Sequence, residues 1–299
     1  MTTAEDTAQG SPALLLLSQA RQRFLTGRPL PDDVPDEAVA AWRRARFLGV
    51  RHDEHEHATV DGRTAGSALL GAARPVLERL APALGRSALL LTDERLRVLW
   101  AGGGMPGGEL RRDLAEREVG HNSAALALRT RRRAEVHGPE HFLDVWQNVS
   151  AVSVPVCDPE SGRPLGTVTV ASGLCADAGP HPGAALAEAA AAAVEAQLLA
   201  RSRTAERTLL DAYEHAVRGT DGQGGGRVRA VVALDGQSRL ISEAAVRLVS
   251  PQVLESLERG ARALAGSAGS AGSAGSAGSA GSAGSAGSAG SAGSAGSAG

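Results

Sequence analysis

Two apolar segments joined by a short turn constrain the fold of this chain more than any other feature. Residues 149–156 and 165–171 are rich in valine and alternate between two sets of side chains, and residues 158–162 between them read Asp-Pro-Glu-Ser-Gly. Such a turn between alternating segments predicts an antiparallel hairpin. Upstream, residues 118–122 read Glu-Val-Gly-His-Asn, a polar turn with a glycine. A polar turn beside a buried sheet is the arrangement of a small ligand-sensing domain.

Apolar periodicity and turn residues predict the remaining elements. We expect helices at residues 12–25, 36–48, 67–84, 110–116, 123–128, 184–217, from Glu243 and at 251–264, with a short helix or turn at 140–146. We expect strands at residues 87–91, 96–100, 134–136, 149–156, 165–171, 228–234 and 239–241. Asp36 is placed to cap the second helix, whose apolar stripe would be Val39, Trp42 and Phe47. Helices beside antiparallel strands predict an α+β protein.

The C-terminal end of the chain is a strict Ala-Gly-Ser repeat over residues 265–299. Because no side chain in it is charged or larger than serine, it buries too little apolar surface to offset backbone ordering, and we expect a disordered tail. An engineered linker, a repeat expansion and a frame-shifted end all fit this pattern. We divide the rest into an N-terminal helical region (1–64), a sheet domain (65–202), a helix and linker (203–226) and a small second unit (227–264).

Composition excludes several classes of protein. All 31 basic residues are arginine, so the lysine of P-loop ATPases, Schiff-base enzymes and kinases is missing. The folded part contains no Gly-x-Ser-x-Gly motif, and we predict no catalytic residue, no cofactor and no enzymatic activity. A net charge of −2 gives no electrostatic footprint for nucleic acid. The chain has two cysteines and no signal-peptide pattern, which indicates a cytoplasmic protein. Its leucine run at residues 14–17 is too short to cross a membrane, so we expect no membrane partner.

A set of short motifs resembles one known family. These are Ala40-Ala41-Trp42-Arg43-Arg44-Ala45 with Gly49-Val50, Ala72-Ala73-Arg74-Pro75-Val76-Leu77, Glu118-Val119-Gly120-His121-Asn122, Val136-His137-Gly138-Pro139-Glu140-His141-Phe142, and Val154-Pro155-Val156 followed by Asp158-Pro159, Gly162 and Leu165-Gly166. Together they resemble the sensory region of bacterial activators of acetoin and dihydroxyacetone operons, which are GAF-domain transcriptional regulators. The resemblance covers roughly residues 36–250, and residues 229–249 resemble the start of the family's PAS-like second domain.

The resemblance implies a GAF-like antiparallel sheet flanked by helices, with N-terminal helices and a partial PAS-like unit. It implies a small-molecule effector of unknown identity and control of transcription. Family members end in a helix-turn-helix, which this sequence does not contain, so DNA binding is expected only through an output domain outside this chain. The chain departs from the family's pattern at His121, Ser123, Ala124 and Ser150, where the pocket would be shaped.

The ligand-binding candidates are His121, Asn122, His137, Ser150 and Ser153. His121 and Asn122 begin a predicted helix, where free backbone N–H groups favour an anion or a carbonyl group. Asn122 has an alternative role in satisfying the backbone of its turn. Glu140 and His141 follow Pro139 and have the alternative of capping a helix start.

Four other clusters have a structural interpretation that competes with a chemical one. The His-Asp-Glu-His-Glu-His run at 52–57 contains metal-ligating residue types, but it lies in a polar linker, and we predict no metal site. Cys157 and Cys175 are candidate redox sensors or incidental thiols. The arginines at 129–133 form either a phosphate contact or a solvated loop. The glycines at 102–108 are expected in a flexible loop.

The long predicted helix at 184–217 has two interpretations. Residues 184–200 fit packing on the sheet of the same chain, and a helix of this length also suits dimerisation or signalling. We therefore expect a homodimeric regulator that binds a small effector and signals through this helix. An accessory signalling module, which acts through protein contacts and has no DNA-binding activity of its own, is the alternative.

Overall fold

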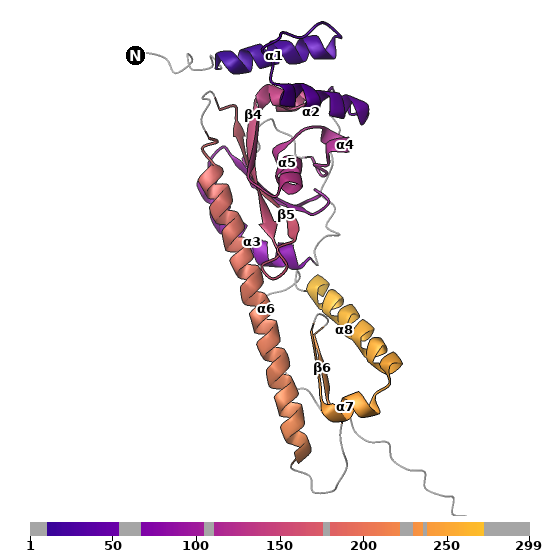
Figure 1. The fold of residues 1–299 in the computed structure, drawn as a ribbon. Coiled ribbons are helices and arrows are strands. Elements are labelled where there is room, and N and C mark those ends of the chain that lie inside the picture. The colour runs from indigo at the N-terminus through magenta and orange to yellow at the C-terminus, as the bar shows by residue number, and fades with distance from the viewer. Residues whose placement is uncertain are drawn as a thin grey trace, which may run out of the picture.

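The centre of the molecule is a five-stranded antiparallel sheet (Figure 1). The computed structural model describes residues 11–53, 67–104, 111–175, 180–221, 230–235 and 238–271. The strands are β1 (Ala88–Asp93), β2 (Val98–Gly103), β3 (Ala134–His137), β4 (Val149–Cys157) and β5 (Pro164–Gly173), in the order β2-β1-β5-β4-β3. Helices flank this sheet, so the α+β class and the GAF-like arrangement are confirmed.

The predicted hairpin forms as β4 and β5. Its register pairs Val152 with Val170 and Ser153 with Thr169. Because successive side chains point to opposite faces, the valines at residues 152–156 and 168–170 share one face of the sheet, while Ser153, Thr167 and Thr169 lie on the other. The two faces therefore differ in chemistry as well as in which helices cover them.

The valine face is covered by two helices, α3 (Ala68–Leu80) and α6 (Ala184–Asp221). Leu77 of α3 and Val194 of α6 are fully buried against Leu89 and Val168 of the sheet. The other face is covered by the short helix α5 (Ser123–Thr130). The layer between this face and α5 is built largely from alanine, serine and threonine, whose small side chains let α5 lie close to the strands.

Two N-terminal helices form a second apolar cluster. Helices α1 (Pro12–Leu25) and α2 (Asp36–Phe47) enclose Trp42, which is fully buried with its ring 5.7 Å from that of Phe24. Two predictions here were wrong. Pro35 takes the N-cap position and no side chain caps the helix, and Phe47 is 90% exposed because it lies off the buried stripe through Trp42 and Ala45.

Other boundaries differ from the predictions for local reasons. The first predicted short helix is instead α4 (Glu116–Val119), and residues 105–110 lie outside the described part. Thr92 and Asp93 continue β1 because they pair with β5, and the loop glycines Gly102 and Gly103 belong to β2. Pro75 lies inside α3 without ending it. Single-turn helices cover Ala81–Leu84, Gly138–Glu140 and Asp144–Trp146.

The second unit is a hairpin with two helices. It consists of β6 (Val232–Leu234), β7 (Arg239–Ile241), α7 (Glu243–Leu248) and α8 (Pro251–Ala271). Helix α8 continues seven residues past Leu264 into the Ala-Gly-Ser repeat, where we expected disorder. Alanine is the strongest helix former, and adding residues to an existing helix avoids the cost of nucleation. Residues 272–299 lie outside the described part.

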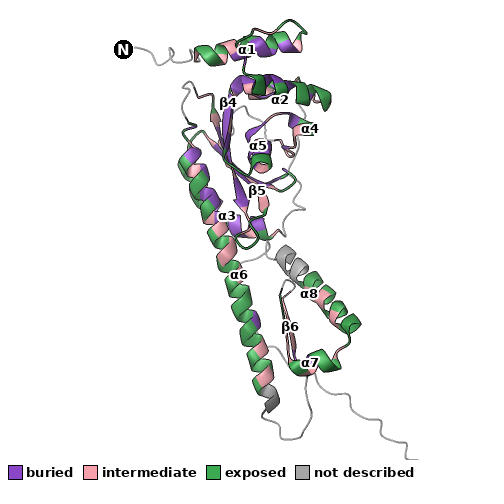
Figure 2. Ribbon diagram, viewed as in Figure 1, coloured by how far each residue is buried: buried purple, intermediate pink, exposed green. Residues whose placement is uncertain are grey.

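Much of the surface of α7 and α8 is exposed (Figure 2). None of the helices in the described ranges combines the length and the apolar composition that a membrane crossing requires.

Candidate functional site

Asn122 is fixed at the start of α5, under the serine and threonine face of the sheet. Its Oδ1 accepts a hydrogen bond from the N–H of Ala125 at 2.9 Å. Its Nδ2 donates to the carbonyl oxygens of Leu114 at 2.8 Å and Gly120 at 3.0 Å. The side chain is buried and its amide is used by the local backbone, which is the structural alternative considered for this residue.

Buried hydroxyl groups connect α5 to β4 and β5, and a second pair connects β5 to β1. Ser153 Oγ lies 2.8 Å from Ser123 Oγ and 2.7 Å from Thr169 Oγ1, and Thr92 Oγ1 lies 2.8 Å from Thr167 Oγ1. All five side chains are buried. Such hydroxyls are costly to bury alone and are stabilised here because they bond to one another. A ligand that enters this layer would have to exchange hydrogen bonds with these groups.

Two histidines next to α5 have buried ring nitrogens without a hydrogen-bond partner among the described residues. His141 is 2% exposed, and its Nδ1 lies 3.3 Å from the carbonyl oxygen of His121. Because a carbonyl oxygen only accepts hydrogen bonds, Nδ1 carries the proton and Nε2 is left as an acceptor. These atoms are His141 Nε2 and His121 Nδ1, of which only His121 Nδ1 has a charged group nearby, the Glu116 carboxylate. The ring of Trp146 meets the His141 ring edge-on at 5.3 Å.

Charge around these two rings is distributed unevenly. Burial lowers the pKa of His141 to about 3, so its ring is neutral at physiological pH. Glu116 has its pKa lowered to about 2 by His121, Arg129 and Arg44. The Nδ1 of His121 lies 4.0 Å from Oε1 of Glu116, while Arg129 donates to the same oxygen at 2.7 Å. The cluster therefore offers a neutral buried acceptor beside an ionised, paired carboxylate.

His137 and Ser150 lie on the opposite face of the sheet, at its edge near the start of α6. Ser150 Oγ accepts from the N–H of Cys175 at 3.0 Å and lies 3.1 Å from His137 Nδ1. His181, which the sequence analysis missed, accepts from the N–H of Gly183 through Nδ1 at 2.9 Å. Its Nε2 faces the carbonyl oxygen of Ser150 at 3.1 Å. Burial lowers the pKa of His181, which agrees with a neutral ring that fixes the start of α6.

The predicted site residues therefore fall into two groups. His121, Asn122 and Ser153 lie on the α5 side, and His137 and Ser150 lie on the α6 side. The structure adds His141, Thr169 and His181, of which His141 alone was considered from the sequence. Thr169 is placed by its pairing with Ser153, so a correct hairpin register would have identified it. His181 precedes α6 by three residues, and no sequence pattern distinguishes it from other loop histidines.

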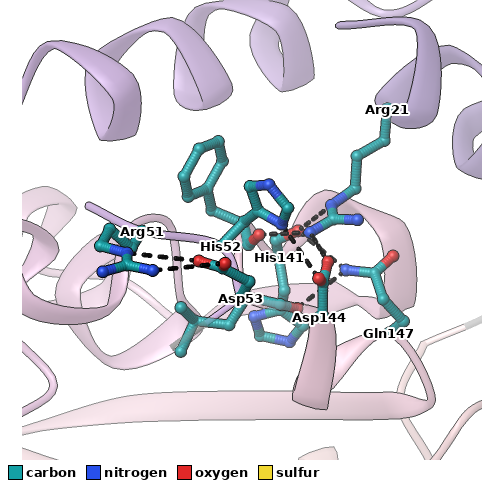
Figure 3. Close-up of polar contacts among 9 residues, drawn as sticks. Arg21, Arg51, His52, Asp53, His141, Asp144 and Gln147 are labelled. Atoms are coloured by element: carbon teal, nitrogen blue, oxygen red, sulfur yellow. Dashed lines mark hydrogen bonds and ion pairs between the residues drawn. The ribbon is translucent and has the colours of Figure 1, made fainter. Parts of the chain in front are cut away.

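A buried arginine ties α1 to the loop that carries His141 (Figure 3). Arg21 donates through Nε to the carbonyl oxygen of His141 at 3.2 Å and through Nη2 to that of Phe142. The same Nη2 lies 2.7 Å from Oδ1 of Asp144, whose Oδ2 lies 2.9 Å from His52 Nδ1. The N-terminal helices are thus bonded directly to the backbone of the candidate site.

The histidine run at 52–57 and the arginines at 129–133 contain residues that bond to other side chains in the described part of the chain. His52 bonds to Asp144, and residues 54–57 of the candidate metal run lie outside the described part. The described residues contain no group of three or more His, Cys, Asp or Glu that could hold a metal ion. Burial, with a smaller effect of Glu195, raises the pKa of Cys157, which disfavours the reactive thiolate. Arg129 pairs with Glu116 and Arg133 pairs with Glu188.

A cavity of about 790 Å³ lies at the far end of the sheet from His141, and none of the predicted site residues lines it. Its walls are the β1–β2 and β4–β5 turns, the start of α3, the middle of α6 and the β6–β7 turn. Charges of both signs occur there, and several are paired, as in Arg97 with Asp93 and Arg163 with Glu94. The cavity therefore lies between the sheet domain and the second unit, and neither sign of charge dominates its walls.

Comparisons with known proteins agree with the motifs found in the sequence. No protein-family model matches the chain. The chain is 29% identical over 208 residues to the propane 2-monooxygenase operon transcriptional activator MimR of Mycolicibacterium smegmatis, and 27% identical over 214 residues to the protein of that name from Mycolicibacterium goodii. These alignments cover 65% of this chain and 35% of each relative, so the chain spans about a third of the length of the curated relatives it matches.

A solved structure shares the fold. The crystal structure of the E. coli DhaR(N)–DhaL complex matches with a TM-score of 0.50 and 20% identity, over 72% of this chain and 76% of that one. The resemblance to the sensory region of bacterial transcriptional activators is confirmed at two levels. The chain is similar in sequence to transcriptional activators, and it shares the fold of the DhaR(N)–DhaL structure.

Proposed function

We propose that this chain is the sensory part of a cytoplasmic transcriptional regulator, in which the GAF-like domain at residues 65–202 binds a small effector and signals through α6. The similarity to transcriptional activators carries this proposal, and the shared fold supports it. Neither a catalytic role nor a cofactor is part of it. DNA binding would come from an output domain outside this chain.

The effector site that we propose lies on the α5 side of the sheet. Its members are His141, His121 and Ser153, with Asn122 holding the turn in place. A buried acceptor without a partner carries a free-energy cost that a ligand hydroxyl or N–H would remove. The neutral ring of His141 fits an uncharged donor better than an anion. His137 and Ser150 then have the separate task of fixing the start of α6.

Signalling requires that the effector bind two conformations of the protein with different affinity. The loop around His141 contacts α1 through Arg21. The α6 helix packs on β4 and β5, the strands that also carry the buried hydroxyls. A change at the site is therefore transmitted to the N-terminal helices in one direction and to α6 in the other.

A thermal-shift screen of small metabolites on the whole chain tests this proposal. A ligand at a hundred times its dissociation constant stabilises the folded state by about 2.7 kcal/mol. The panel should include diols, acetoin-like ketones and aromatic acids. We expect a stabilising compound whose effect is lost in His141→Gln and Ser153→Val and kept in His55→Ala, a control in the polar linker. A hit that survives both site variants contradicts the proposed site.

A protein-interaction module without its own DNA-binding activity is the second candidate. Large apolar side chains on α7 and α8 are exposed, among them Val246 at 69%, Leu248 at 63% and Leu264 at 71%. Exposed apolar surface of this kind marks sites of protein association. The similar fold of DhaR(N) was solved in complex with DhaL. A screen without any stabilising compound, on a chain that remains folded, would favour this candidate.

A further inference from the structure

The cavity of about 790 Å³ beside the β1–β2 turn has an apolar floor. Leu69 of α3 and Leu99 of β2 line it and belong to the buried core between the sheet and its two helices. Leu165 of β5 and Leu198 of α6 pack against the same core, stay partly exposed and line the cavity as well. Small-molecule sites are concave, mostly apolar and about 300–1,000 Å³ in volume. The cavity therefore has the size and the floor of such a site.

Contacts within the chain hold the walls of this cavity in place. Arg201 of α6 donates through Nη2 to the carbonyl oxygen of Gly71 in α3 at 2.7 Å. Ser202 of α6 donates through its hydroxyl group to Oε1 of Glu160, in the β4–β5 turn, at 2.6 Å. These bonds join three of the elements that line the cavity. Because a ligand does not have to order these walls, less of its binding free energy is lost on entry.

Two charged side chains of the walls are left without a partner. The other charges there bond within the chain, as Arg97 does with Asp93. The side chains of Arg95, in the β1–β2 turn, and Glu206, on α6, form no hydrogen bond or ion pair in the part of the chain that the structure describes. A ligand with a single charge would satisfy one of them, whereas a ligand with one charge of each sign satisfies both.

We propose that this cavity binds a zwitterion with an apolar body, namely an apolar α-amino acid or a short apolar peptide with free ends. Its carboxylate bonds to the guanidinium group of Arg95, its ammonium group bonds to the carboxylate of Glu206, and its aliphatic side chain lies on the leucine floor. Both end groups are ionised at neutral pH. Hydrogen bonds between ionised groups are roughly twice as strong as neutral ones, so the two ends fix the orientation of the ligand.

Isothermal titration calorimetry on the whole chain tests this site, with L-leucine and leucyl-leucine as probes. The two share their chemistry and differ in the separation of their charges, so the tighter binder reports the span between Arg95 and Glu206. We expect a dissociation constant below about 1 mM for that probe. Ala205→Trp, which fills the cavity from an exposed position on α6, should abolish its binding. Arg207→Gln and Asp211→Asn, exposed changes on α6 outside the cavity, should keep it.

Analogues of the tighter probe assign each of its charges to one side chain. The desamino form lacks the ammonium group and the amide form lacks the carboxylate, so each should bind the wild type about tenfold more weakly. Arg95→Gln should weaken the intact probe about tenfold and leave the amide form unchanged. Glu206→Gln should weaken the intact probe about tenfold and leave the desamino form unchanged. Circular dichroism confirms that each variant stays helical.

Three results overturn the proposal. The first is no binding of either probe at about 10 mM. The second is binding that Ala205→Trp leaves unchanged, which would place the site elsewhere. The third is a loss between intact probe and analogue that is the same in the wild type and in the two charge variants. None of the residues proposed for the effector site lines this cavity, so His141→Gln should bind the probe as the wild type does. Failure here is therefore distinguishable from failure of effector binding under α5.

Discussion

Protonation of His141 should be the main reason that this protein loses stability below neutral pH. The ring is buried, and its pKa is lowered to about 3, first by burial and then by the nearby charges of His121, His137 and Arg21. An unfolded chain has an ordinary histidine with a pKa of about 6.5. Between these two values the unfolded state binds more protons than the folded state. Stability is therefore fully present above pH 6.5 and is lost as the pH falls towards 3.

The size of this effect follows from the two pKa values. A fall from pH 7.5 to pH 5 should reduce the free energy of unfolding by about 2 kcal/mol through His141 alone, given its folded-state pKa of about 3. In His141→Gln the group no longer titrates, so this part of the pH dependence disappears. The variant should be less stable than the wild type at pH 7.5, because it disturbs a packed site, but its stability should change less with pH.

Urea unfolding at several pH values, followed by tryptophan fluorescence, measures both quantities. Trp146 contacts the His141 ring, so its emission reports on this region directly. His215→Gln, on the exposed side of α6, is the matched control and should keep the wild-type pH dependence. His181 is also buried with a lowered pKa and adds a loss of the same sign. Equal slopes for wild type and His141→Gln between pH 5 and 7.5 would refute the assignment of a neutral, buried ring.

Three further changes test the packing around the site. Arg21→Met leaves the carbonyl oxygen of Phe142 without its Arg21 donor, removes one of two donors from that of His141 and breaks the ion pair with Asp144, and should cost about 2–4 kcal/mol in urea unfolding. Limited proteolysis of this variant should release the N-terminal helices first. Gly166→Ala places a methyl group 1.9 Å from the carbonyl oxygen of Thr92 and should cost about 3 kcal/mol or more. Gly173→Ala, with open space at the same position, should be close to neutral in the same assay. Asn122→Ala removes a helix cap and two further hydrogen bonds and should lower the unfolding free energy by about 2–3 kcal/mol.

The secondary structure of the sheet domain was predictable where short segments of the sequence specify it. The valine-rich segments and the turn at residues 158–162 gave the hairpin β4–β5, and the family motifs gave its GAF-like setting. Phe47 was misplaced because a count of apolar residues does not say which side of a helix the rest of the chain covers. The helical start of the repeat was missed because composition describes a segment alone, whereas α8 extends into it from a folded helix.

The candidate site was predictable only in part. Ser150 and Ser153 are three residues apart in one strand, so their side chains must point to opposite faces of the sheet. This alternation alone places Ser153 on the α5 side and Ser150 on the α6 side. The position of His137 beside Ser150 depends on β3 pairing with β4, a long-range contact. The unpartnered nitrogen of His141 depends on the packing of the loop against Trp146 and His121, which no spacing in the sequence specifies.

The most direct test of the sensor is amide hydrogen exchange of the whole chain, with and without the compound that gives the largest thermal shift. Our account predicts slower exchange at residues 120–153, around His141 and α5, together with a change along the second half of α6. Slower exchange confined to the second unit, or to the cavity beside the β1–β2 turn, would contradict a site under α5. Protection around His141 without any change in α6 would contradict its role in signalling.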